Sequence, residues 1–206
     1  MQALDTQTSI EVNFSPLLRR YTLEEFWALP EREDHARYNL IGGFLFMVPP
    51  PNPPHQDVAS RMNETLMRFV LNNNIEGHVY FPPAPIYVRA EGSTYLEPDL
   101  MFVSTESRQR MGTAFTSADI VFEFSSRRTI IYDHTTKADT YLALGVRELW
   151  LVNPSSATIE VRHAGKIGEK LVWHVLRYSR GQQAQSRVLE GFEVSVTDLF
   201  EGLVTE

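Results

Sequence analysis

Two acidic residues lie within or directly before stretches of sequence that predict buried β-strands. Glu123 lies within the apolar run 120–124, and Asp99 follows Pro98 directly ahead of the apolar run 100–103. Burial of an unpaired carboxylate is costly, so Glu123 requires a positive charge, a hydrogen-bond donor or a shared proton. If the two strands are neighbours, both carboxylates reach one point, where Mg²⁺ would find the oxygen ligands that it prefers. The alternative is that Asp99 belongs to an ordinary turn.

A lysine on the following predicted helix adds a positive charge to this pattern. Asp133, Lys137 and Tyr141 are spaced four residues apart and therefore lie along one stripe of a helix. The apolar residues of this helix place Lys137 at the border of the face that packs on the sheet, so its ammonium can extend toward the carboxylates. There it would stabilise charge on a phosphate oxygen or orient an attacking water. Taken alone, Lys137 is also typical of a solvated helix surface.

The hydrophobic pattern predicts an α/β chain whose strands and helices would position these residues. The strand–helix–strand unit over 118–152 indicates a mixed sheet with at least one parallel pair. The expected elements are a helix over 23–29 started by the capping box of Thr22 and Glu25, a hairpin over 38–48 around Gly42-Gly43, a stiff proline connector over 49–54, a helix over 55–71, strands over 78–88, 95–104 and 118–125, a helix over 133–144 capped by Asp133 and ended by Gly145, a strand over 147–152 and a C-terminal β-meander.

Length and composition favour one globular domain over 21–206, preceded by a loose arm over 1–20. The chain has 206 residues, a net charge of −7 and no cysteine, which excludes thiolate metal sites and cysteine nucleophiles. No apolar stretch is long enough to cross a membrane and no signal peptide is evident, so a cytoplasmic location without a membrane partner is expected. The negative charge argues against a protein that wraps nucleic acid, although it is compatible with a local basic patch.

Other catalytic motifs are missing from the sequence. The six histidines show no metal-ligand spacing, and the chain has no HExxH, GxSxG, Walker or dinucleotide-binding motif. Zinc-protease, esterase, NTPase and Rossmann functions are therefore not expected. Among the histidines, His55 is the one that merits a test.

The ordered segments YTLEEFWALPE, YNLIGGFLFMVPPPNPPHQ, LEPDLMFVS, ADIVFEFSS and DHTTKADTYLALGVRELWLVNP resemble the Uma family of restriction endonucleases, within the PD-(D/E)XK nuclease superfamily. The resemblance covers about 21–200. It implies a restriction-endonuclease-like α/β fold: a mixed central β-sheet flanked by helices, with an N-terminal β-hairpin and a C-terminal β-meander. It also implies hydrolysis of DNA phosphodiester bonds that depends on Mg²⁺ or Mn²⁺.

The resemblance assigns roles to particular residues. Asp99, Glu123 and Lys137 are the implied catalytic residues, and the main-chain carbonyl of Phe124 joins the two acids as a metal ligand. Ser125 stands where the superfamily usually has its lysine, whose place Lys137 takes on the next helix. The positions expected to support the site are Tyr141, Asp133, His55, Gln56, Asn39 and Ser125.

Two departures from the family pattern leave other functions open. Asn39 and Gly42 stand in the first hairpin where the family commonly has acidic residues. One alternative is therefore a member that lost catalysis and serves as an interaction or dimerisation module. Another is a hydrolase of a different phosphodiester. DNA is the expected partner, and a homodimer is compatible with the sequence.

Overall fold

A computed structural model describes residues 19–31, 37–89, 93–125 and 129–203. Most of the expected N-terminal arm lies outside these residues. Among the residues described, no helix is both long and apolar enough to cross a membrane. The elements are α2 (Leu23–Trp27), β1 (Arg37–Ile41), β2 (Phe44–Val48), α3 (Pro53–Asn72), β3 (Gly77–Tyr80), β4 (Ile86–Val88), β5 (Thr94–Leu96), β6 (Leu100–Ser104), α4 (Thr105–Arg110), β7 (Ile120–Phe124), α5 (Ile130–Tyr132), η1 (Asp133–Lys137), α6 (Ala138–Ala143), β8 (Glu148–Asn153), β9 (Thr158–Ile167), β10 (Lys170–Tyr178), β11 (Gln183–Gln185), β12 (Glu193–Ser195) and α7 (Val196–Leu199).

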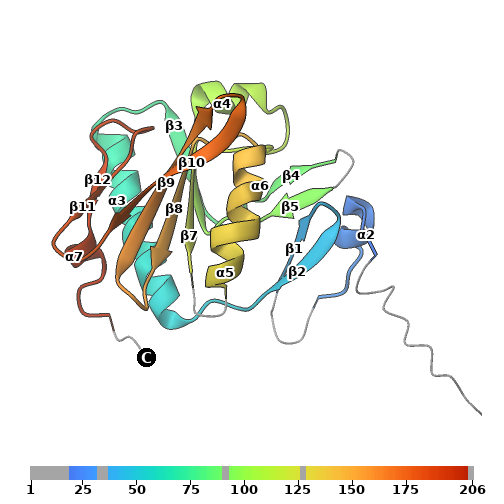
Figure 1. Cartoon of the computed structure of the whole chain (residues 1–206), viewed down its shortest axis with the longest axis horizontal. Helices are drawn as coiled ribbons and strands as arrows, with labels where there is room; N and C mark the ends of the chain where they lie inside the picture. The colour runs from blue at the N-terminus through green and yellow to red at the C-terminus, as the bar shows by residue number, and fades with distance from the viewer. Residues whose placement is uncertain (1–18, 32–36, 90–92, 126–128, 204–206) are drawn as a thin grey trace, which may run out of the picture.

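The described strands form a six-stranded sheet and two smaller sheets. The large sheet has the order β10-β9-β8-β7-β6-β3, and the four-stranded sheet has the order β2-β1-β5-β4. β7 and β8 are parallel, as expected for strands joined by a helical crossover, and β6 pairs antiparallel with β7. Figure 1 shows α3 and α6 on opposite sides of the large sheet, with the hairpin β1–β2 beyond α6.

Each face of the large sheet has its own hydrophobic core. One core joins Val58, Met62 and Leu66 of α3 to the β7 and β8 side chains on the same face of the sheet, among them Phe122 and Trp150. The other joins Ala138 and Tyr141 of α6 to the opposite sides of the same strands. Because successive side chains of a strand point to opposite faces, β7 contributes to both cores and is fully buried.

The helix α3 begins earlier than the sequence predicts. Pro53 and Pro54 occupy its first turn, and the Asn52 side chain caps it by accepting a hydrogen bond from the His55 amide at 3.1 Å. Proline is tolerated there because the first helical amides lack an intrahelical partner. The connector therefore ends at Asn52, and only its preceding prolines lie outside the helix.

Two of the predicted strands are each divided between sheets. The segment 78–88 forms β3 in the large sheet and then β4 in the four-stranded sheet. The segment 95–104 forms β5 in the four-stranded sheet and then β6 in the large sheet. Pro82, Pro83 and Pro85 lie at the first division and Pro98 at the second. Proline lacks the amide hydrogen that a sheet ladder needs, so both strands end where it occurs.

The C-terminal meander is confirmed for β8, β9 and β10, which pair in succession. The predicted meander does not continue beyond β10. Instead β11 and β12 pair with each other in a separate two-stranded sheet, whose Ala184 and Val194 close the core over α3.

Candidate active site

The two candidate carboxylates meet at one end of the large sheet. The β6–β7 ladder ends at the pair Leu100 and Phe122, and Asp99 and Glu123 are the next residues beyond that pair. The Phe124 amide donates a hydrogen bond of 2.9 Å to Asp99 Oδ2. The structure therefore brings the two acids together, as the sequence predicts.

The Glu123 carboxylate is buried and held from the helical segment η1–α6. Lys137 Nζ donates to Glu123 Oε2 at 2.5 Å, and the Tyr141 hydroxyl donates to Oε1 at 2.6 Å. Asp133 Oδ1 lies 3.6 Å from the same ammonium. All four side chains are buried. The predicted stripe of Asp133, Lys137 and Tyr141 therefore faces the sheet, and Lys137 belongs to the interior instead of the solvated surface.

The helix that carries this stripe differs from the expected one. It begins at Ile130, and its segment Asp133–Lys137 has π-helical hydrogen bonding. Asp133 therefore does not cap the helix: it is buried one turn inside it and contacts Lys137. Gly145 follows the helix with φ of 83°, as predicted.

Burial and charge set the protonation of this group. Burial raises the pKa of Glu123 above its ordinary value, and the neighbouring Lys137 charge opposes that shift. Burial also lowers the pKa of Lys137, but the carboxylates of Glu123, Asp133 and Asp99 outweigh it and raise that pKa above its ordinary value. Lys137 is therefore a charged donor, fixed on Glu123.

Asp99 has a different environment, because its side chain is about a quarter exposed, at 26%. His55 Nε2 lies 3.1 Å from Asp99 Oδ2, which also accepts the Phe124 amide. Burial alone would raise the Asp99 pKa, but these contacts and the Lys137 charge lower it. The pKa values of Asp99 and Glu123 are thus displaced in opposite directions.

The hairpin β1–β2 contacts the site through Tyr132. Asn39 Nδ2 donates to the Tyr132 hydroxyl at 3.2 Å, and the Phe46 ring stacks on the Tyr132 ring with centroids 5.0 Å apart. The Lys137 ammonium lies 5.8 Å from the centroid of the same ring. Sequence reasoning selected Asn39 but missed Tyr132 and Phe46. The only indication of Tyr132 in the sequence was an aromatic residue at the start of the helix that carries Lys137.

The remaining predicted positions differ in their placement. Ser125 follows Glu123 on the same face of the strand and is buried, and its hydroxyl has no hydrogen-bond partner among the described residues. Gln56 is exposed on α3, and no hydrogen bond joins it to this group within the described chain. The structure therefore places Ser125 in the interior beside Glu123 and Gln56 on the surface.

A second polar cluster supports the π-helical segment from β9. Arg162 donates to the His134 carbonyl at 3.0 Å and to Glu160 at 2.6 Å. Arg177 of β10 donates to the other Glu160 oxygen at 2.6 Å. These contacts fix the backbone beside Lys137. Sequence reasoning missed this cluster.

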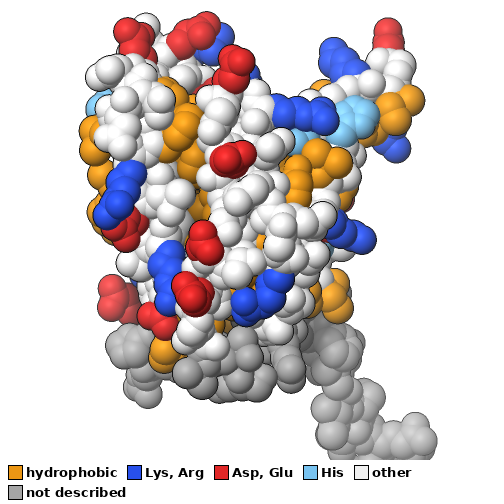
Figure 2. Space-filling view, turned by 90° about the vertical axis from the view of Figure 1, so that its left-hand side faces the viewer, with side chains coloured by type: hydrophobic (Ala, Val, Ile, Leu, Met, Phe, Trp, Pro, Cys, Tyr) orange, Lys and Arg blue, Asp and Glu red, His pale blue; other side chains and the backbone are white. Residues whose placement is uncertain are grey.

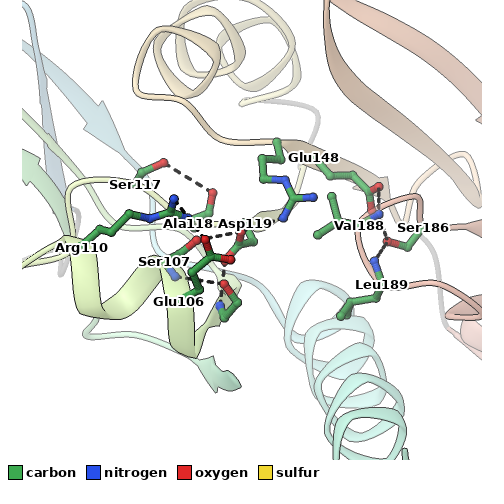
Figure 3. Close-up of polar contacts among 12 residues, drawn as sticks. Glu106, Ser107, Arg110, Ser117, Ala118, Asp119, Glu148, Ser186, Val188 and Leu189 are labelled. Atoms are coloured by element: carbon green, nitrogen blue, oxygen red, sulfur yellow. Dashed lines mark hydrogen bonds and ion pairs between the residues drawn. The ribbon is translucent and has the colours of Figure 1, made fainter. Parts of the chain in front are cut away.

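Two other buried acids lie at the opposite end of the strands and serve the fold. Asp119 precedes β7 and accepts hydrogen bonds from the Ser104 amide, the Ser107 hydroxyl and Arg147. Figure 3 shows Asp119 and Ser107 apart from Glu148. The Glu148 carboxylate accepts hydrogen bonds from the backbone amides of Arg187 and Val188. Because donors already surround these carboxylates, they stabilise loops.

The carboxylate oxygens of Asp99 and Glu123 are ligands better suited to Mg²⁺ than to Zn²⁺. Among the described residues, no three His, Cys, Asp or Glu side chains are clustered to hold a metal. Zinc sites use at least three protein ligands, whereas Mg²⁺ takes one or two carboxylates and completes its shell with water and phosphate. Asp99 Oδ1 has no hydrogen bond within the described chain, and each Glu123 oxygen keeps a second lone pair.

The face that bears α3 and the β11–β12 sheet offers no extended basic surface among the described residues. Figure 2 shows acidic and basic side chains intermingled on that face. Phosphate binding there would lack the clustered positive charge that it needs.

Comparison with known proteins agrees with this architecture. The chain matches the family model Uma2, described as putative restriction endonuclease, over residues 23–197. It is also similar to the crystal structure of a putative nuclease belonging to DUF820 from Anabaena variabilis, with a TM-score of 0.67 and 19% identity over 87% of this chain and 97% of that chain. This likeness confirms the expected nuclease-like α/β fold. No curated protein matches the chain.

Proposed function

The chain belongs to the Uma2 family of putative restriction endonucleases, and from this membership and its site we propose that it is a metal-dependent endonuclease that hydrolyses DNA phosphodiester bonds. One observation carries the proposal. Asp99 and Glu123 directly follow the last pair of the β6–β7 ladder, the Phe124 amide donates a hydrogen bond to Asp99, and the Lys137 ammonium donates one to Glu123.

The residues of this chain divide the work by position. Asp99 and Glu123, with the Phe124 carbonyl, would hold Mg²⁺ or Mn²⁺. Tyr141 fixes the second oxygen of Glu123 and so orients that carboxylate. When bound, the cation would supply Lewis-acid charge stabilisation and lower the pKa of water.

Lys137 would act on the phosphate. Its ammonium is desolvated, positively charged and held by Glu123 and Asp133, so its position is set before substrate arrives. A fixed positive charge in a buried site stabilises developing negative charge more strongly than one in water. Lys137 would therefore stabilise the transition state of phosphodiester cleavage.

The test is cleavage of supercoiled plasmid and single-stranded DNA with Mg²⁺ or Mn²⁺. We expect cleavage by the wild type and its loss, by at least about 100-fold, in Asp99→Asn and Glu123→Gln. Asp139→Asn is the matched control, because Asp139 is exposed on the same helix as the site residues. Equal cleavage by Asp99→Asn and Asp139→Asn would refute the assignment of the metal site.

A catalytically inactive interaction module is the competing proposal, and Asn39 is the observation that favours it. This residue is buried on the hairpin and hydrogen-bonded to Tyr132, at a position where the family resemblance predicts an acid. No cleavage of either DNA, together with no binding of Mn²⁺, would favour this alternative. Cleavage of a phosphodiester other than DNA, with no cleavage of DNA, would favour the alternative of a hydrolase acting on a different phosphodiester.

A further inference from the structure

One contact to the Asp99 carboxylate comes from the sheet and the other comes from α3. Its Oδ2 atom lies 3.1 Å from His55 Nε2 and accepts the Phe124 amide at 2.9 Å. Since an ionised carboxylate oxygen only accepts hydrogen bonds, the His55 Nε2 atom is the donor of that pair. Two donors on one oxygen leave Oδ1 directed away from them.

Two contacts besides the one to Asp99 hold His55, one at its backbone and one at its ring. Its backbone amide is bound by the Asn52 cap, and two prolines precede it in the first turn of α3. Its ring lies edge-on to the Phe124 ring, with centroids 5.6 Å apart and planes inclined by 70°. A side chain fixed in this way presents its donor without a further loss of rotamer freedom.

The other ring nitrogen of His55 indicates a specific function. His55 Nδ1 is buried and has no hydrogen-bond partner among the described residues. Buried polar groups are normally paired, and an unpaired one costs stability. A residue kept only for packing would not need this arrangement, whereas an imidazole needed for its Nε2–H explains it.

From these contacts we infer that His55 is a positioning residue, which orients Asp99 so that its Oδ1 atom is presented to a divalent cation. The inference rests on the proposed function. Hydrogen-bonding partners of ligating carboxylates typically contribute 10- to 100-fold to metal affinity, so loss of His55 should weaken binding without removing a ligand. His55 touches neither the cation nor the phosphate.

The experiment is calorimetric titration of Mn²⁺ into the full-length protein without DNA. We expect His55→Ala to bind Mn²⁺ about 10- to 100-fold more weakly than the wild type. His55→Gln should recover part of the affinity, because its amide nitrogen can donate from a similar position. His78→Ala is the control, since His78 is exposed on β3. The Tm of each variant separates orientation from unfolding.

The outcomes separate the two proposals. Mn²⁺ affinity within twofold of the wild type in His55→Ala would overturn the role of His55 and leave the nuclease proposal standing. Equal loss in His55→Gln and His55→Ala would also overturn it, because the donor would then be irrelevant. No binding of Mn²⁺ by the wild type would overturn the metal site itself, and the role of His55 with it.

Discussion

Replacing Glu160 by glutamine should destabilise the protein in a way that depends on pH. The Glu160 carboxylate is buried and accepts hydrogen bonds from Arg162 and Arg177, with His134 Nδ1 3.5 Å away. Burial would raise its pKa, but His134 and the two arginines lower it to about 2 from an ordinary value of 4.5. Glutamine keeps the shape of the side chain and loses the charge.

The magnitude follows from that pKa. A difference between 4.5 and about 2 corresponds to ~3 kcal/mol of stability from the ionised form. The Arg177 side chain is 78% exposed, so solvent screens its share, and we expect about 2 kcal/mol at pH 7. Because the pKa is depressed in the folded state, this contribution is fully present above pH 4.5 and is lost as pH falls toward 2.

The assay is urea denaturation of the wild type and Glu160→Gln between pH 7 and pH 3. The difference in free energy of unfolding should be about 2 kcal/mol at pH 7 and should shrink below pH 4.5. Glu64→Gln is the control, since Glu64 pairs with Arg68 on the surface and both are exposed. A difference that stays constant with pH would refute the reasoning.

The other predictions concern the site and one strand. Lys137→Met should lower the free energy of unfolding by about 3 kcal/mol, because Glu123 would stay buried without its ion pair. Adding Glu123→Gln should recover part of that free energy in urea denaturation, and additive effects of the two substitutions would contradict the coupling. Mg²⁺ at ten times its Kd should stabilise the wild type by about 1.4 kcal/mol in thermal unfolding, and an equal shift in Asp99→Asn would place the ion elsewhere. Gly77→Ala should destabilise the chain by about 2 kcal/mol, because its new Cβ would lie 2.6 Å from the Phe102 ring and 2.8 Å from the Val103 carbonyl, and wild-type stability would show that the strand shifts easily.

The sequence singled out Asp99, Glu123 and Lys137, and it predicted that the two acids meet on the condition that their strands are neighbours. A carboxylate inside an apolar strand has few stable environments, and helix periodicity placed Lys137 and Tyr141 on one face. Both statements depend on local patterns. The confirmed hairpin also follows from a local rule, since Gly42 and Gly43 adopt φ of 59° and 85° at its turn.

What the sequence did not predict depends on partners far along the chain. Tyr132 receives Asn39 from 93 residues away, and His55 reaches Asp99 across 44 residues. The strands β11 and β12 contribute Ala184 and Val194 to the core that contains α3, which lies far earlier in the chain. A single sequence carries no signal for such long-range contacts, because periodicity describes only neighbours within one element.

The π-helical segment Asp133–Lys137 shifts the phase between α5 and α6. A turn of this kind holds one residue more than an α-helical turn, so it rotates everything before it by about 100° relative to everything after it. Tyr132, on one side, meets the hairpin, while Tyr141, on the other, meets Glu123. Deletion of a single residue here would restore a regular helix and leave only one of these two contacts in place. Length variation in this segment should therefore separate relatives that keep both contacts from those that keep one.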